Sequence, residues 1–240
     1  MICCLVKYFV LIGGFQKLTL IDYPEKIACV IFLIGCNFRC PFCYSSELVL
    51  LEKIKNQPKI SERDIFDFLK EKKGLIEGVV ISGGEPTIHK NLLNFCKKIK
   101  ELGYPIKLDT NGSNPDLLKD LIEKKLIDYI AMDIKASKEK YEEYSGVKID
   151  IKKIEKSIKL LKEEKINYEF RTTLAPGLNY SDSIKIVNWL KPTKKYFLQR
   201  FRTDKEIINP DIKKLVSLKE EKIEKIIEGV KKEFEICKLR

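Results

Sequence analysis

The chain has 240 residues, of which 44% are hydrophobic and 34% are charged, a composition that is ordinary for a soluble globular protein. The formal net charge is +11. Lysines are interleaved with glutamates, as in 219–222, so the charge indicates solvated helix faces rather than a surface for nucleic acid. The apolar start, residues 1–11, is too short to span a membrane and lacks the features of a convincing signal peptide. We expect an edge strand or a leader there, and binding to neither membranes nor nucleic acid.

Apolar runs alternate with helical patterns from residue 27 onward. The capping-box pattern Ser61-x-x-Asp64 opens the first predicted helix. A strand followed by a helix, repeated six times along the chain, predicts an α/β fold with a parallel sheet. The sheet is expected to be either open or closed into an incomplete (βα)6 barrel. Strands are predicted at 27–32, 78–81, 106–108, 128–132, 168–171 and 196–199, and helices at about 62–73, 91–102, 115–124, 151–163, 182–190 and 219–234.

Three cysteines follow the first predicted strand with the spacing Cys-x3-Cys-x2-Cys: Cys36, Cys40 and Cys43. Thiolates select zinc, copper(I) or iron–sulfur clusters, and three ligands rather than four leave one coordination position for a substrate. The eight cysteines show no disulfide framework, which favours a reduced, cytoplasmic protein. A structural zinc site completed from elsewhere, or simple buried thiols, remain open on this motif alone. We expect Cys29, Cys96 and Cys237 to pack as small, buried hydrophobic side chains.

Polar motifs stand at the carboxyl ends of the predicted strands, the edge at which parallel α/β folds bind ligands. They are the cysteines, Gly83 to Thr87, Asp109 to Gly112, Asp133 to Lys135, and Gln199. We therefore expect these loops to converge on one site. The lone histidine, His89, opens a helix without a ligand partner nearby, and we expect it on the surface.

These motifs suggest specific contacts. Glu85, after two glycines, suits an ammonium group, although a plain glycine turn is an equal alternative. Lys135 and Arg171 suit a carboxylate, or form ordinary salt bridges. Asp109, Thr110 and Asp133 offer oxygen ligands for a hard cation, or cap their own loops.

The cysteine motif together with Gly83-Gly84-Glu85-Pro86 resembles the radical S-adenosylmethionine superfamily. The stretches 14–24, 35–41 and 109–112 resemble glycyl-radical-enzyme activating enzymes, closest to the activating protein of anaerobic ribonucleoside-triphosphate reductase. The resemblance covers about 14–202. Because no internal repeat, low-complexity stretch or linker divides the chain, we expect a single domain over 1–240, with a leader or edge strand at 1–13, a core at 14–202 and a helical tail at 203–240.

The resemblance implies that Cys36, Cys40 and Cys43 hold a [4Fe-4S] cluster whose fourth iron binds S-adenosylmethionine. The expected cofactor-binding residues are Phe42, Cys43, Tyr44, Gly83, Gly84, Glu85, Ile134, Lys135, Arg171 and Phe201. Tyr44 departs from the family, where His followed by Asn is frequent. A related activator holds a monovalent cation at the positions of Asp109, Thr110, Met132 and Asp133.

The implied reaction is reductive cleavage of S-adenosylmethionine, after which a 5′-deoxyadenosyl radical takes hydrogen from a glycine of the partner enzyme. The cofactors carry the chemistry, so no catalytic side chain is expected. The expected partners are anaerobic ribonucleotide reductase and an electron donor such as flavodoxin or ferredoxin. One alternative is a radical enzyme acting on a small molecule or RNA base, such as a deazapurine synthase. Another is a zinc-stabilised binding module.

Overall fold

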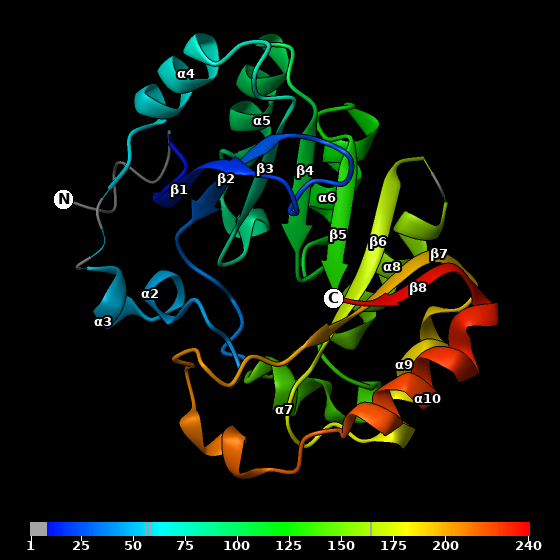
Figure 1. The fold of residues 1–240 in the computed structure, drawn as a ribbon. Helices are drawn as coiled ribbons and strands as arrows, with labels where there is room; N and C mark the ends of the chain where they lie inside the picture. Colours follow the sequence, from blue (N-terminus) through cyan, green and yellow to red (C-terminus); the bar gives the residue numbers. More distant parts are fainter. Residues whose placement is uncertain (1–8, 56, 58, 164) are drawn as a thin grey trace.

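The computed structural model describes residues 9–55, 57, 59–163 and 165–240. These residues form one eight-stranded sheet in the order β1 to β8 (Figure 1). The strands β2 to β8 are parallel, and β1 pairs antiparallel with β2. Their bounds are β1 Ile12–Thr19, β2 Ala28–Leu33, β3 Gly78–Gly83, β4 Ile106–Thr110, β5 Tyr129–Asp133, β6 Asn167–Leu174, β7 Thr193–Arg200 and β8 Phe234–Leu239.

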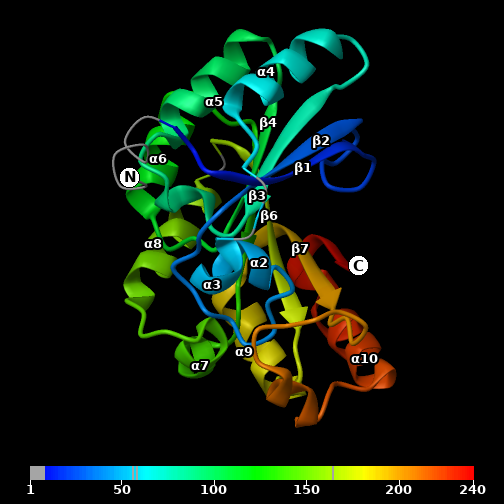
Figure 2. The ribbon, with the colours of Figure 1, turned by 90° about the vertical axis from the view of Figure 1, so that its left-hand side faces the viewer.

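Helices cover the outer side of the curved sheet (Figures 1 and 2). The covering helices are α4 Glu62–Glu71, α5 Leu92–Glu101, α6 Pro115–Glu123, α8 Ile151–Lys162, α9 Tyr180–Leu190 and α10 Glu220–Val230. Shorter helices are α2 Ser46–Val49, α3 Leu51–Ile54 and α7 Tyr141–Ser145, with 3₁₀ turns η1 Pro86–Ile88, η2 Lys138–Lys140, η3 Pro210–Lys214 and η4 Lys231–Glu233. None of the helices in the described part of the chain is long and apolar enough to cross a membrane.

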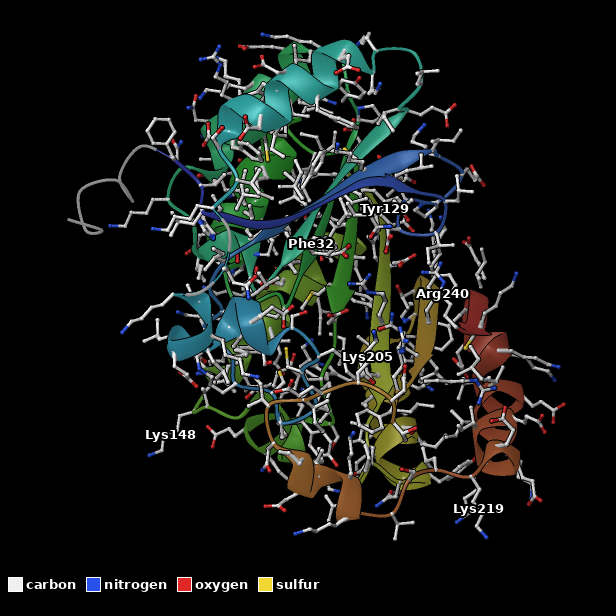
Figure 3. All side chains as sticks on the ribbon, turned by 60° about the vertical axis from the view of Figure 1, so that its left-hand side comes forward. Phe32, Tyr129, Lys148, Lys205, Lys219 and Arg240 are labelled. Carbon is white, nitrogen blue, oxygen red and sulfur yellow. The ribbon has the colours of Figure 1, made fainter. Side chains whose placement is uncertain are left out.

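Alternation along each strand separates two environments. One side of the strands, with Ile31, Ile81 and Leu108, joins the large core beneath the helices. The other side carries a small apolar cluster around Val30, Val80 and Tyr129, against which Phe32 packs; Phe32 and Tyr129 are labelled in Figure 3. Charged side chains lie on this inner side too, and they are buried: Lys107 and Glu169.

The predicted α/β fold, its six parallel strands and its six helices are confirmed. The capping box at Ser61 is also confirmed, because Asp64 N–H donates to its hydroxyl at 3.1 Å. The helical tail predicted for 203–240 is wrong in part: after α10 the chain returns to the sheet as β8 and pairs with β7. Residues 1–8 of the expected leader lie outside the described residues, and the edge strand β1 begins at Ile12.

Two smaller expectations also need correction. His89 is not on the surface: it is 9% exposed, and its Nε2 lies 2.9 Å from the Ile34 carbonyl oxygen. Cys29 and Cys96 are fully buried, as expected, whereas Cys237 is only partly buried because it lies on the edge strand β8.

Candidate active site

A cavity of about 630 Å³ opens at the carboxyl ends of the strands. The cysteine loop after β2 forms one wall, and the carboxyl ends of β3 to β6, with the residues that follow β3, β4 and β5, form the floor. Most of the predicted site residues line it: Cys36, Cys40, Phe42, Cys43, Tyr44, Gly83, Gly84, Glu85, Asp109, Thr110, Asp133, Lys135 and Arg171. Gln199 lines the cavity too, so the topology brings together predicted positions that are up to 163 residues apart in sequence, as the parallel fold requires.

Three of the predicted residues are not among those lining the cavity. Ile134 and Met132 are fully buried in the core beneath the helices. Phe201 stacks on Tyr44, with ring centroids 5.8 Å apart. The Tyr44 hydroxyl accepts a hydrogen bond from the backbone N–H of Arg202, so this tyrosine ties the cysteine loop to the segment after β7.

The cysteine loop is held by hydrogen bonds to its backbone carbonyl oxygens. Arg39 folds back, and its guanidinium donates to the carbonyls of Cys36 and Phe38 at 2.7 Å. Two N–H groups of the segment after β7, from Ile208 and Asn209, donate to the carbonyls of Cys43 and Pro41. The loop is thus shaped before any ligand arrives.

Close packing of the backbone explains why residues 83 and 84 are both glycine. A β-carbon on Gly83 would stand 2.4 Å from the backbone of Leu33, and Gly83 has φ +116°, a conformation that favours glycine. Gly84 N–H donates to the Leu33 carbonyl at 2.9 Å, and Glu85 N–H donates to Gly35 O at 2.8 Å. The close approach is therefore between this loop and the cysteine loop, backbone to backbone.

Glu85 is 1% exposed and accepts four hydrogen bonds. The donors are the Thr87 N–H and hydroxyl, the Thr110 hydroxyl at 2.7 Å and the Asn111 N–H at 2.6 Å. All four donors are uncharged, so the carboxylate is solvated by dipoles rather than paired with a cation. Burial raises the pKa of Glu85, and these hydrogen bonds oppose the shift.

A chain of amides connects Glu85 to the cysteine loop. Asn111 donates from Nδ2 to the side-chain oxygen of Asn37 at 2.9 Å, and Asn37 donates to the Ser113 hydroxyl at 2.8 Å. Asn37 stands between the first two cysteines of the motif. This role of Asn37 was not predicted, although a polar residue inside the cysteine motif is a signal that could have suggested it.

Two carboxylates on the floor are paired with cations. Asp133 accepts from Arg171 Nε at 2.8 Å and from Lys135 Nζ at 3.0 Å. Burial would raise the pKa of Asp133, but these two charges outweigh it and lower the pKa to about 2. Asp109 lies 3.4 Å from Arg171 and also pairs with Lys107. Burial opposes ionisation of Asp109 as well, and the Arg171 and Lys107 charges lower its pKa overall.

Burial raises the pKa of all three cysteine thiols of the loop, which favours their protonated form. Burial raises the pKa of Cys36 to about 12, with Glu85 adding to the shift, and burial raises the pKa of Cys40 to about 11. An iron ion would replace these protons, because metal binding deprotonates a coordinating thiol. In the described part of the chain, no three His, Cys, Asp or Glu side chains form a preformed site for a metal ion. The fit to a cluster rests on three thiols of one loop that line one cavity.

The sequence and the fold match a known class of enzymes. The model of the radical SAM superfamily matches residues 30–190, and the chain belongs to that superfamily. Its cofactors are accordingly a [4Fe-4S] cluster and S-adenosylmethionine, and the protein is a radical SAM enzyme. A zinc-stabilised binding module is no longer an alternative.

Individual relatives refine the comparison. A Methanocaldococcus jannaschii protein, provisionally named a glycyl-radical enzyme activating enzyme, is 37% identical over 92% of both chains. A 7-carboxy-7-deazaguanine synthase of Thermococcus kodakarensis is 29% identical over 54% of this chain and 56% of that enzyme. The solved structure of TYW1 with a lysine-pyruvate adduct matches with a TM-score of 0.60 and 18% identity, over 85% of this chain and 73% of that chain. The structural match shows the partial-barrel fold.

Proposed function

We propose that this enzyme activates a glycyl-radical enzyme, with anaerobic ribonucleoside-triphosphate reductase as the target. The observation that carries the proposal is the likeness to the Methanocaldococcus jannaschii relative, which extends over 92% of both chains. The bound cluster and S-adenosylmethionine supply a carbon-centred radical, and the partner supplies the glycine. The chain's own residues bind and orient the cofactor.

The charges of the cavity suit the methionine end of S-adenosylmethionine. Glu85 is a buried carboxylate with uncharged donors only, so its charge is available to an ammonium group nearby. Lys135 and Arg171 stand on the floor and suit the carboxylate. The negative charge of Glu85 and the positive charges of Lys135 and Arg171 would fix the orientation of the ligand and bring it to the iron that no cysteine holds. Tyr44 and Phe42 offer aromatic surface for the adenosine.

The entrance of the cavity suits a polypeptide. Ile21, in the loop between β1 and β2, lines the cavity and is 86% exposed. Leu20 and Leu18 beside it are 69% and 57% exposed. Exposed apolar side chains gathered at one place are typical of a protein interaction site. A loop that presents a glycine to the cavity would pass these side chains, and the contact would keep water from the radical.

A second candidate is a radical enzyme that makes a deazapurine. It is favoured by the likeness to the 7-carboxy-7-deazaguanine synthase of Thermococcus kodakarensis, which covers about half of each chain. That coverage is smaller than the coverage of the glycyl-radical relative, so we place this function second.

The test mixes the cluster-loaded enzyme with a flavodoxin or ferredoxin reductant, S-adenosylmethionine and the host's anaerobic ribonucleotide reductase, without oxygen. We expect an electron paramagnetic resonance doublet from a glycine radical, and its loss when that glycine of the reductase is replaced by alanine. If the enzyme cleaves S-adenosylmethionine and the reductase is folded but no protein radical forms, the proposal fails. Formation of a deazapurine instead would select the second candidate.

A further inference from the structure

Lys107 is a lysine buried inside the sheet. Most lysines of the chain are exposed, such as Lys148 and Lys219, which point away from the molecule in Figure 3. The side chain of Lys107 is only 2% exposed, and lysine is rarely buried to this degree unless it is paired. In the sheet register Lys107 lies between Val80 and Tyr129. Its neighbours along this row are thus uncharged.

The ammonium of Lys107 is directed at one carboxylate, the one that forms part of the cavity floor. Its Nζ donates to Oδ1 of Asp109, two residues further along β4. Asp109 lines the cavity, and Lys107 is not among the lining residues. Any effect of Lys107 on a ligand in the cavity would therefore pass through Asp109, which makes Lys107 a positioning residue.

The other oxygen of Asp109 is occupied as well. Its Oδ2 accepts from the Ser82 hydroxyl at 3.2 Å and lies 3.4 Å from Arg171 Nη1. With Asp133 and Lys135, this group contains three cations and two carboxylates. One positive charge is in excess, which suits an anionic ligand group and opposes the addition of another cation.

These residues do not fit the dissolved monovalent cation that the family resemblance implies. The oxygens of Asp109 and Asp133 already accept from side chains of the protein. The Thr110 hydroxyl donates its proton to Glu85, and its oxygen accepts from the Gly112 N–H at 3.1 Å. The Met132 side chain is fully buried in the core beneath the helices. The residues of the implied cation site are present in the sequence, but their side chains already contact other groups of the protein.

We propose that the ammonium of Lys107 is a built-in monovalent cation, which takes the place of a dissolved potassium or sodium ion beneath the S-adenosylmethionine site. It keeps Asp109 ionised and in place, and it contributes positive charge below the carboxylate of the ligand. A cation attached to β4 costs no ordering of a free ion when the ligand binds. S-adenosylmethionine should therefore bind to this enzyme without any dissolved alkali cation.

The experiment measures binding, so it does not depend on the identity of the glycyl-radical partner. Cluster-loaded enzyme without reductant is titrated with S-adenosylmethionine by calorimetry, once in tetramethylammonium chloride and once in potassium chloride at equal ionic strength. We expect wild-type affinity to be the same in both salts. An increase of about tenfold or more in potassium would overturn the proposal, and this arm needs no variant.

The variant Lys107→Met removes the cation and keeps most of the side-chain volume. We expect its affinity to fall by about tenfold or more in tetramethylammonium, as for loss of a charged hydrogen bond, and to recover in potassium or ammonium chloride. Lys107→Gln serves if that variant does not fold. Lys100→Met, which breaks the pair with Asp128, is the matched control and should behave as wild type. Unchanged affinity in a Lys107 variant, or a loss that no cation restores, would mean that Lys107 does not replace an ion.

Discussion

The α-carbon of Gly84 lies so close to Gly35 that a β-carbon on Gly84 would stand 1.9 Å from the Gly35 carbonyl oxygen. The hydrogen bond from Glu85 N–H to the same oxygen, at 2.8 Å, fixes this approach. The glycine pair after β3 and the cysteine loop are therefore one packed unit. A change in one of them should be measurable in the other.

Gly84→Ala should impair cluster loading. The added methyl group meets backbone, which cannot rotate away as a side chain can, so the cysteine loop must move. We expect reconstituted protein to hold less than half of the wild-type iron, measured by metal analysis and visible absorbance. Gly229→Ala is the control, because its nearest contact is 3.9 Å away and alanine favours the helix α10. Equal iron in both variants would contradict the packing argument.

Cys40→Ala should abolish the cluster. The three thiols of the motif line one cavity, and each is expected to hold one iron, so loss of one ligand leaves the cluster open to loss or rearrangement. Iron content and cleavage of S-adenosylmethionine should fall together. Cys237→Ala, a partly buried cysteine on β8, should keep both. A Cys40→Ala protein with a full cluster and full cleavage would rule out the assignment.

Glu85→Gln should weaken binding of S-adenosylmethionine. The amide keeps the volume of the side chain but removes the negative charge, and a charged hydrogen bond contributes roughly 1.5–3 kcal/mol, or about tenfold and more in affinity. Calorimetry on cluster-loaded protein measures it. Glu85→Ala should in addition lower the melting temperature, because it leaves the buried donors of Thr87, Thr110 and Asn111 without their acceptor. Wild-type affinity in Glu85→Gln would reject the role.

The affinity for S-adenosylmethionine should also depend on pH. Burial raises the pKa of Glu85, so the carboxylate protonates at a higher pH than an ordinary glutamate and then loses its attraction for an ammonium group. Affinity should be full above this raised pKa and fall as the pH drops through it. Asp133, with a pKa of about 2, stays ionised throughout this range. The affinity of Glu85→Gln should depend less on pH than the affinity of the wild type. An equal pH dependence of affinity in the variant and the wild type would contradict the prediction.

Ile21→Asp should uncouple the enzyme from its partner. The side chain is 86% exposed, so the substitution should leave folding unchanged while a charge replaces apolar surface at the entrance. We expect glycine radical formation to fall at least about tenfold, while cleavage of S-adenosylmethionine without the partner stays at the wild-type rate. Leu75→Asp changes a leucine that is 66% exposed and is not among the residues that line the cavity, and it should have no effect. Equal radical yields in the two variants would exclude this entrance as the docking surface.

The sequence sufficed for the parts of the fold that have strong local signals. Buried parallel strands are apolar runs, and the six central strands were predicted for that reason. The strand β8 was missed because Phe234–Leu239 directly follows α10 and η4, and only its partner β7, some forty positions earlier, makes it a strand. His89 was misplaced for a similar reason, since its partner is a backbone carbonyl at Ile34.

The sequence predicted which residues belong to the candidate site, but not the hydrogen bonds that connect them. Spacing and strand ends indicated which residues meet in the cavity. Spacing does not show that the donors of Glu85 are all uncharged, nor that Asn37 joins Asn111. Lys107 was missed because a single lysine in a short strand also fits a solvent-facing position. Only the curvature of the sheet, visible in Figures 1 and 2, turns that face inward.

The segment after β7 donates two backbone hydrogen bonds to the cysteine loop, from Ile208 and Asn209. By thermodynamic linkage, a ligand that stabilises the cysteine loop also stabilises the docked segment, and docking of the segment stabilises the loop. Maturation of the enzyme is therefore coupled to a part of the chain that is synthesised more than 160 positions after the cysteines. A ribosome-bound chain that still lacks this segment would present an unclosed loop, so iron insertion should follow, rather than accompany, synthesis of the barrel.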